Sequence, residues 1–169
     1  MFDRYSEKAR RAIFFARYEA TRFNSPMVES EHLLLGIMRE DKALMRNLIT
    51  PPDLIDSIHT QIEARTPVQH EIAIVSLPEI SKELAKGSPP SFEFVRKLIE
   101  ANPAIHDQTA KGVNLPLSDE CKNAMNAAEG EANRLNSKHV GTEHLVLGIL
   151  REDKCFAAKL LRDRGVTPE

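Results

Sequence analysis

The stretch SEHLLLGIMREDK, residues 30–42, returns almost unchanged as TEHLVLGILREDK at residues 142–154. The likeness extends beyond this phrase, because residues 6–49 align with residues 118–161 without a gap and 20 of the 44 aligned residues are identical. Internal similarity at a fixed spacing indicates a repeated structural unit. The sequence therefore predicts two copies of one fold unit.

Each copy begins with a segment whose apolar residues recur at helical spacing. They are Ala9, Ala12, Ile13, Ala16, Ala20 and Phe23 in the first copy, and Cys121, Ala124, Met125, Ala128, Ala132 and Leu135 in the second. This spacing predicts an amphipathic helix with one buried face. Ser6 and Ser118 are predicted to cap these helices, because a hydroxyl can accept a hydrogen bond from a first-turn amide.

The repeated phrase predicts a second helix in each copy, apolar nearly all the way round and therefore buried. Ser30 and Thr142 are expected at its N-cap, where their hydroxyls would satisfy first-turn amides. Gly36 and Gly148 are unfavourable inside a helix by about 1 kcal/mol relative to alanine. We expect each glycine to permit the close approach of another backbone.

A third helix is expected in each copy, KALMRNLI and KCFAAKLL, capped by Asp41 and Asp153. Prolines 51 and 52 end the first of these, and DLIDSIHTQIEAR predicts a fourth helix that the second copy lacks. The expected organisation is a first repeat at 1–65, a partly helical insertion at 66–117 and a second repeat at 118–169, forming one compact domain. PEISKELAKG and SFEFVRKLIEAN are the expected helices of the insertion.

The doubled phrase, [ST]EHxxLG[IL]xREDK, resembles the Clp N-terminal repeat domain found at the front of ClpA-, ClpB- and ClpC-type unfoldases. The resemblance covers about residues 1–65 and 115–169, and it implies an all-α fold of two four-helix repeats related by a pseudo-twofold axis. It also implies a module without catalysis of its own, which binds protein substrates or adaptors and passes them to a Clp ATPase. The chain contains no GxxxxGK[ST] phosphate loop, so ATP binding by that route is excluded.

ClpC-type members recognise phosphorylated arginine through the glutamate of this phrase, so the resemblance implies candidate ligand contacts at Glu31 and Glu143, with Ser30 and Thr142 beside them. A helix N-terminus can hold a phosphate while an adjacent carboxylate pairs with the guanidinium. The alternative is that Ser or Thr followed by Glu is only a favourable helix start. Glu29 stands where the second copy has glycine and would add negative charge near a phosphate, which favours the second site.

The first helix of the first copy carries aromatic residues that its counterpart lacks. Phe14, Phe15 and Tyr18 align with Asn126, Ala127 and Gly130. Two interpretations stay open: the insertion packs over these rings, or they form an exposed patch for a partner helix or an unfolded substrate.

Other function classes receive less support. His32 and His144 each follow a glutamate, but no HExxH or Cys/His cluster adds further ligands, so a metal-binding or hydrolytic protein is a minor alternative. We expect no metal and no cofactor. A regulatory or structural subunit that docks on a Clp protease complex is the main alternative to a substrate-binding module.

Composition narrows the partners and the compartment. The formal charge of −2, from 23 basic and 25 acidic residues, provides no basic field for nucleic acid. No apolar run approaches the ~18 residues that suggest a membrane span. Cys121 and Cys155 are too few and too far apart for a disulfide framework, so reduced thiols in a cytoplasmic protein are expected.

Overall fold

The computed structural model describes residues 3–65 and 115–168, which form helices and no extended strand. The helices are α1 (Glu7–Arg22), α2 (Ser30–Glu40), α3 (Lys42–Leu48), α4 (Asp53–Arg65), α8 (Asp119–Arg134), α9 (Thr142–Arg151) and α10 (Phe156–Arg162). The predicted all-α class is confirmed for these residues. Both helices expected in the insertion lie outside the described residues.

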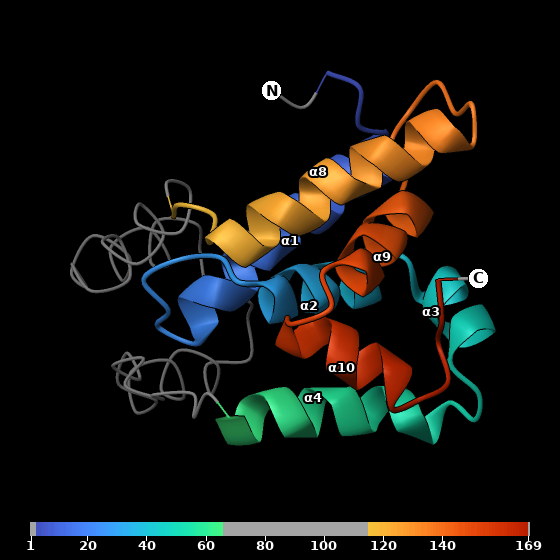
Figure 1. Ribbon diagram of the computed structural model, residues 1–169. Coiled ribbons are helices and arrows are strands. Elements are labelled where there is room, and N and C mark those ends of the chain that lie inside the picture. The colour runs from blue at the N-terminus through green and yellow to red at the C-terminus, as the bar shows by residue number, and fades with distance from the viewer. Residues whose placement is uncertain (1–2, 66–114, 169) are drawn as a thin grey trace, which may run out of the picture.

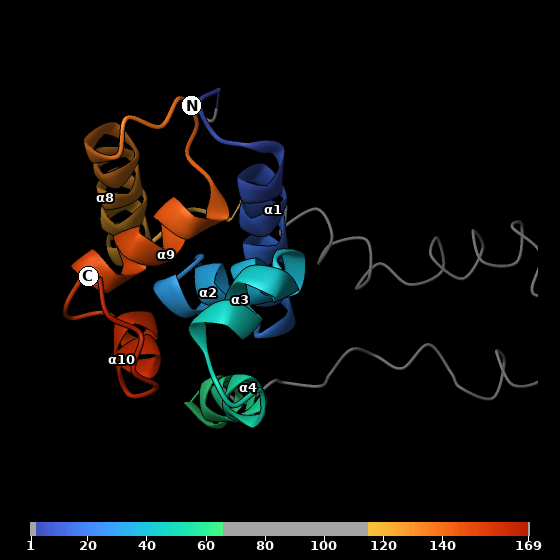
Figure 2. The same ribbon diagram turned by 90° about the vertical axis from the view of Figure 1, so that its right-hand side faces the viewer.

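The helices form three layers that contain one member of each repeat. α1 and α8 lie at one end, α2 and α9 in the middle, and α4 and α10 at the opposite end, with α3 at the side (Figures 1 and 2). α1, α2 and α3 correspond in order to α8, α9 and α10. The repeats predicted from the sequence therefore fold as matching units.

Two short backbone pairings hold the repeats together, and the internal symmetry relates one to the other. Tyr5 pairs with Val140, and Val28 pairs with Leu117. In each pairing, the segment before the first helix of one repeat meets the segment before the middle helix of the other. The first turn of each middle helix is thereby placed beside the opposite repeat.

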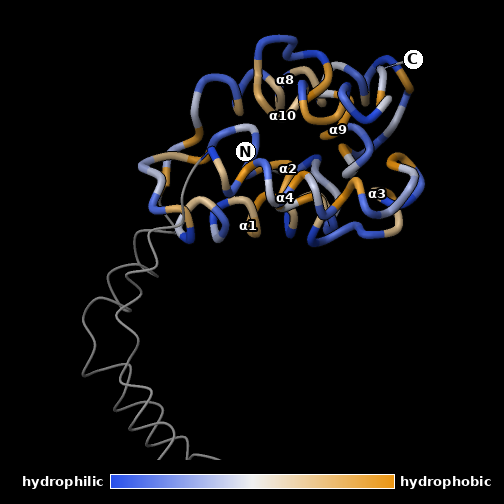
Figure 3. The backbone as a smooth tube through the Cα atoms, turned by 90° about the horizontal axis from the view of Figure 1, so that it is seen from below, coloured by the Kyte–Doolittle hydropathy of each residue, from blue (hydrophilic) through white to orange (hydrophobic). Residues whose placement is uncertain are grey.

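The core is shared between the repeats. Its largest fully buried side chains come mainly from the middle helices and from α3, α4 and α10: Leu33, Leu34, Leu35, Ile37, Met45, Ile49, Ile58, Ile62, Leu145, Ile149, Leu150 and Leu160. Hydrophobic stretches of the chain gather around α2, α9 and α10 in Figure 3. Among the described helices, none combines the length and apolar character needed to cross a membrane.

The two middle-helix glycines lie against the backbone of the preceding helix, as predicted. A methyl group at Gly36 would overlap the carbonyl oxygen of Ala12 and lie 2.7 Å from the Ala16 nitrogen. A methyl group at Gly148 would overlap the Ala124 oxygen and lie 2.8 Å from the Ala128 nitrogen. The repeated glycine therefore sets the close packing of α1 on α2 and of α8 on α9.

The N-caps of α1 and α8 agree with the prediction, and those of the middle helices, α2 and α9, do not. Ser6 and Ser118 accept hydrogen bonds from first-turn amides at 3.2 and 3.1 Å. The N-caps of α2 and α9 are Glu29 and Gly141, so the prediction of Ser30 and Thr142 is wrong by one residue. Both predicted caps instead occupy the first helical position, with their hydroxyls directed into the interior.

The third helices differ in their caps. Asp41 caps α3 as predicted, with its Oδ1 accepting a hydrogen bond from the Leu44 amide at 3.1 Å. Asp153 does not cap α10, because its carboxylate pairs with Arg162. Cys155 takes the cap position, and its Sγ accepts a hydrogen bond from the Ala158 amide at 3.4 Å.

A buried glutamate joins the first and second helices of each repeat. Glu19 contacts Arg22 at 2.7 Å and Arg39 at 3.2 Å. The aligned residues repeat this arrangement: Glu131 contacts Arg134 at 2.7 Å and Arg151 at 2.9 Å. Because each carboxylate meets two guanidinium groups, its charge is balanced where it leaves water.

Candidate functional site

The second copy of the predicted site, Glu143 with Thr142, lies in a pocket at the first turn of α9. This pocket has a volume of about 370 Å³. We name it the α9 tip pocket; its lining residues are Ser6, Lys8, Asp41, Ser137, Lys138, His139, Gly141, Thr142 and Glu143. Both repeats contribute to it, because Ser6, Lys8 and Asp41 come from the first repeat and the others from the second.

Backbone contacts fix the position of this pocket. The Ser6 amide donates to the Val140 carbonyl at 2.9 Å, and the Val140 amide donates to the Arg4 carbonyl at 2.9 Å. The next residue, Gly141, is the N-cap of α9, and its amide donates to His144 Nδ1 at 3.0 Å. The amides of the following first turn have no acceptor within the helix, so they can bind an anion.

Glu143 is the accessible carboxylate of the α9 tip pocket, with 57% of its side chain exposed. Its Oε1 lies 3.1 Å from His144 Nδ1. That contact is not an ion pair, because Nδ1 already accepts the hydrogen bond from the Gly141 amide. The carboxylate is therefore available to a cationic group of a ligand.

Thr142 and Asp41 form a buried link between the repeats behind the pocket. The Thr142 hydroxyl donates to Asp41 Oδ2 at 2.8 Å, and Lys8 Nζ lies 3.4 Å from the same oxygen. Burial alone would raise the pKa of Asp41. Hydrogen bonds from the Leu44 amide and the Thr142 hydroxyl, together with the charge of Lys8, outweigh that effect and hold this pKa below its usual value.

In the first repeat, the equivalent turn is the first turn of α2, and it is buried. Ser30 is fully buried and only 3% of Glu31 is exposed. The Ser30 hydroxyl donates to Glu31 Oε2 at 3.2 Å. Burial, the charge of Glu31 and a hydrogen bond between the two carboxyl groups raise the pKa of Glu29. A ligand arriving from solvent therefore has no direct access to Glu31 in this structure.

One position accounts for much of this difference. A methyl group at Gly141 would overlap both carboxylate oxygens of Glu143 and lie 2.5 Å from its Cδ atom. Glu29 stands at the aligned position and has a side chain there. Glu31 is consequently excluded from the conformation that Glu143 adopts, and its carboxylate is buried instead.

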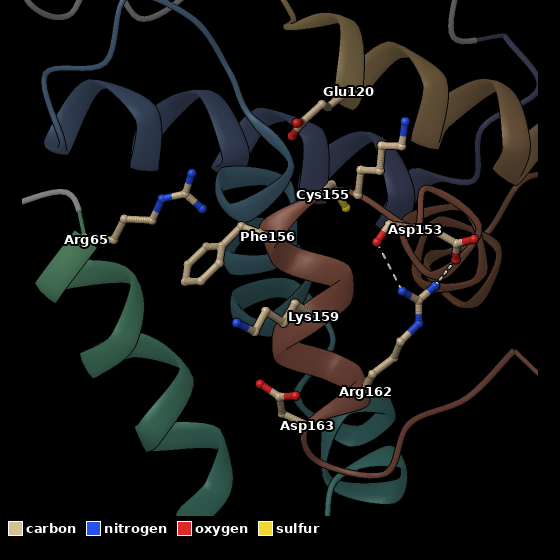
Figure 4. A pocket seen from close by; sticks show the side chains of 9 residues that line it. Arg65, Glu120, Asp153, Cys155, Phe156, Lys159, Arg162 and Asp163 are labelled. Atoms are coloured by element: carbon tan, nitrogen blue, oxygen red, sulfur yellow. Dashed lines mark hydrogen bonds and ion pairs between the residues drawn. The ribbon is translucent and has the colours of Figure 1, made fainter.

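At the junction of the repeats beside the first turn of α2, one side chain has the opposite charge to its counterpart in the α9 tip pocket. This junction contains a pocket of about 430 Å³ between α4, α8 and α10, in which Arg65 stacks over the Phe156 ring at 4.3 Å (Figure 4). Glu120 points into this pocket from α8. Because Glu120 aligns with Lys8, the first-repeat junction places a negative charge where the α9 tip pocket has a positive one.

Both histidines of the repeated phrase have a role in helix capping. His32 Nδ1 accepts a hydrogen bond from the Glu29 amide at 3.0 Å, as His144 does from Gly141. Burial lowers the pKa of His32, and the resulting neutral form suits an acceptor at Nδ1. Within residues 3–65 and 115–168, no three His, Cys, Asp or Glu side chains are grouped as a metal would require.

The aromatic residues of α1 lie partly at the surface. Phe14 is 62% exposed and Tyr18 is 47% exposed, whereas Phe15 is half-buried. The guanidinium of Arg39 lies 4.8 Å from the ring centres of both Phe15 and Tyr18. The alternative in which the insertion covers these rings involves residues outside the described part of the chain.

The sequence-based site omitted residues that the structure brings to it. Lys8, Asp41 and Lys138 line the α9 tip pocket, and none of them was predicted as a site residue. Lys8 and Asp41 are far from Glu143 in the sequence. No local sequence signal marks them, because only the packing of the two repeats brings Lys8 at the start of α1 and Asp41 at the end of α2 to the start of α9.

Comparisons with known proteins agree with this architecture. The family model for the Clp repeat (R) N-terminal domain matches residues 72–164. The chain is 26% identical over 167 residues to the chaperone protein ClpB of Oceanobacillus iheyensis and 27% identical over 168 residues to the chloroplastic chaperone protein ClpC of Pisum sativum. These alignments cover 99% of this chain but only 16% and 14% of those proteins.

Solved structures show the same fold. The N-terminal domain of the Clp-associated chaperone ClpD from Arabidopsis thaliana superposes with a TM-score of 0.59 at 22% identity, covering 99% of this chain and 89% of that one. A structure from a study of a malarial protein secretion system superposes with a TM-score of 0.62 at 14% identity, covering 98% and 87% of the two chains. At these identities the likeness concerns the fold alone.

Proposed function

The chain belongs to the Clp repeat (R) N-terminal domain family, and from this premise we propose that it is a non-catalytic module that binds protein substrates or adaptors for a Clp-type AAA+ unfoldase. The names of its relatives, which are chaperones and ATP-binding subunits of Clp proteases, support this role. The chain spans about one seventh of their length. The module would therefore work with an ATPase ring and protease subunits.

We propose the α9 tip pocket as its ligand site, with a phosphorylated arginine side chain as the ligand. The observation that carries this proposal is the exposed carboxylate of Glu143 beside Lys8 and Lys138 in one pocket. A phosphoarginine group carries a phosphate next to a guanidinium. The free amides of α9 and the two lysines suit the phosphate, and Glu143 suits the guanidinium.

Thr142 would act indirectly in this site. Its hydroxyl is buried and already donates to Asp41, so it would position the first turn of α9 without contacting the ligand. Ser30 and Glu31 would not bind in the conformation described, because both are buried. The proposal is therefore one phosphoarginine site for each chain.

The test is calorimetric titration of the chain with free phosphoarginine. Glu143→Ala and Lys8→Ala should each weaken binding by about tenfold or more, as expected for losing one charge-assisted contact. Glu120→Ala is the matched control, because Glu120 is the aligned counterpart of Lys8. Binding that survives Glu143→Ala unchanged, or that Glu120→Ala weakens equally, would contradict this assignment.

A reducing compartment such as the cytoplasm is the proposed location. It is supported by two free cysteines, Cys121 and Cys155, both buried. Burial raises the pKa of Cys121 to about 12 and also raises that of Cys155, so neither thiol ionises readily near neutral pH. Chloroplastic proteins among the relatives make the chloroplast a second compartment to examine by fractionation.

A further inference from the structure

A second concave surface lies in the first repeat, on elements that do not form the α9 tip pocket. It has a volume of about 500 Å³ and lies where α1, α2, α3 and α4 converge. We name it the α3 groove; its lining residues are Glu19, Arg22, Leu35, Met38, Arg39, Lys42, Met45, Arg46, Pro52, Ile55, Asp56 and His59. The second repeat has no described counterpart of α4, so this groove is a feature of the first repeat.

The rim of the α3 groove is positively charged, although the whole chain carries a formal charge of −2. Arginine and lysine contribute four positive charges there, against two carboxylates. Glu19 is buried and pairs with Arg22 and Arg39, so its negative charge is already neutralised. The exposed side chains of Lys42 and Arg46 have no ion-pair partner within residues 3–65 and 115–168. These two cations are available to an anionic partner.

The floor of the α3 groove is apolar. Met38 and Met45 line it from the core, with only 5% and 1% of their surface exposed, and Ile55 is half-buried. Because methionine side chains are flexible, these two can shift when a side chain of a partner packs against Ile55. The volume is in the range of protein pockets that bind small ligands.

The α3 groove is continuous with the aromatic residues of α1 through one side chain. Arg39 lines the groove and also lies against the rings of Phe15 and Tyr18. A partner seated in the groove can therefore extend over an exposed aromatic surface. Apolar and aromatic area flanked by cations suits a segment that alternates apolar and acidic residues.

We propose that the α3 groove binds a short acidic segment of a partner protein. An apolar side chain of that segment packs against Ile55 and over the two methionines, and its flanking carboxylates pair with Lys42 and Arg46. A structured nucleic acid fits less well, because its phosphates would be left over the apolar floor. This site is separate from the proposed phosphoarginine site, so either one can fail without the other.

The test measures fluorescence polarisation of a labelled peptide in which one leucine is flanked by glutamates. Lys42→Glu and Arg46→Glu should each weaken binding by about tenfold, because both replace an attraction with a repulsion. Both side chains are exposed, so the variants should fold, and circular dichroism checks this. Replacing the glutamates of the peptide by glutamine, or its leucine by serine, should also weaken binding.

Two further variants make the result specific. Lys154→Glu is the matched control, because Lys154 is the aligned counterpart of Lys42. This substitution makes the same change of charge in the other repeat. It should leave the affinity unchanged, as should Glu143→Ala. Equal weakening by Lys154→Glu, insensitivity to Lys42→Glu and Arg46→Glu, or stronger binding of a single-stranded RNA than of the peptide would each overturn the proposal.

Discussion

Gly141 and Glu29 occupy the same position in the two repeats, and they lead to different surroundings for the carboxylate two residues later. Beside Gly141, Glu143 lies over the glycine backbone and stays exposed. Beside Glu29, Glu31 is buried. The absence of one side chain therefore leaves the α9 tip pocket open, and its presence closes the first-repeat site.

Gly141→Ala tests this at the level of one methyl group. The new methyl would overlap the Glu143 carboxylate, which is the flexible end of a side chain and can move away. We therefore expect markedly weaker phosphoarginine binding by calorimetry, with little change in melting temperature. Gly130→Ala is the control, because a methyl group there meets nothing within 4 Å. Unchanged affinity in Gly141→Ala would contradict a role for Glu143 in ligand binding.

The link between Thr142 and Asp41 predicts a stability effect. Thr142→Val removes a buried hydrogen bond to a charged group, so the free energy of unfolding should fall by about 1.5–3 kcal/mol. Thr60→Val, at an exposed position, should change it by less than about 0.5 kcal/mol. Urea denaturation of both variants measures the difference. Equal effects would mean that the link between the repeats adds little stability.

At this scale, the sequence placed Ser30 and Thr142 at the starts of the middle helices but assigned them the wrong helical position. A Ser or Thr before Glu predicts a cap, yet Ser30 and Thr142 are the first helical residues. Their hydroxyls have partners elsewhere: Glu31 in one repeat, and Asp41 of the opposite repeat in the other. The second of these contacts depends on tertiary packing, which no local rule contains.

At the level of helices, the close contacts at Gly36 and Gly148 should dominate stability. Gly36→Ala and Gly148→Ala each force a methyl group against a carbonyl oxygen of the neighbouring helix, so we expect losses of about 1–3 kcal/mol or more. Gly130→Ala, in the open middle of α8, should instead raise stability by about 1 kcal/mol through helix propensity. Chemical denaturation measures all three. A gain in all three variants would contradict the close packing.

The buried glutamates predict a pH effect. Hydrogen bonds and charge from Arg134 and Arg151 lower the pKa of Glu131 from its ordinary value of 4.5. A lowered pKa in the folded state stabilises the protein above the unfolded value, and this contribution is lost as pH falls through the folded value. Glu131→Gln should therefore lower the melting temperature at neutral pH, and the difference should shrink as the pH drops below 4.5. A constant difference would contradict the ion-pair role.

Most helices were predictable from the sequence because they depend on local signals. The serine caps and apolar spacing of α1 and α8 predict their positions, and the two prolines predict the break before α4. The prediction that Asp153 caps α10 is wrong. Its carboxylate pairs with Arg162 of that helix, and Cys155 is the N-cap instead. A side chain with two possible partners cannot be assigned from spacing alone.

At the scale of the whole molecule, the α9 tip pocket exists only because two repeats meet. From the first repeat, Lys8 reaches it beside the pairing of Tyr5 with Val140, and Asp41 reaches it through the hydrogen bond from Thr142. The repeat pattern predicts two similar units, but it does not state which ends come together. The sequence consequently predicted the candidate residues at the first turns of the middle helices and missed those supplied by the opposite repeat.

The most direct test of one open and one closed site is an amide NMR titration of the chain with phosphoarginine. Shifts should be confined to residues 141–143, Lys8 and Lys138, with the amides of residues 29–31 unchanged. Glu143→Ala should abolish these shifts while the spectrum stays that of a folded protein. Shifts at residues 29–31, or none at residues 141–143, would contradict the assignment of the α9 tip pocket as the single phosphoarginine site.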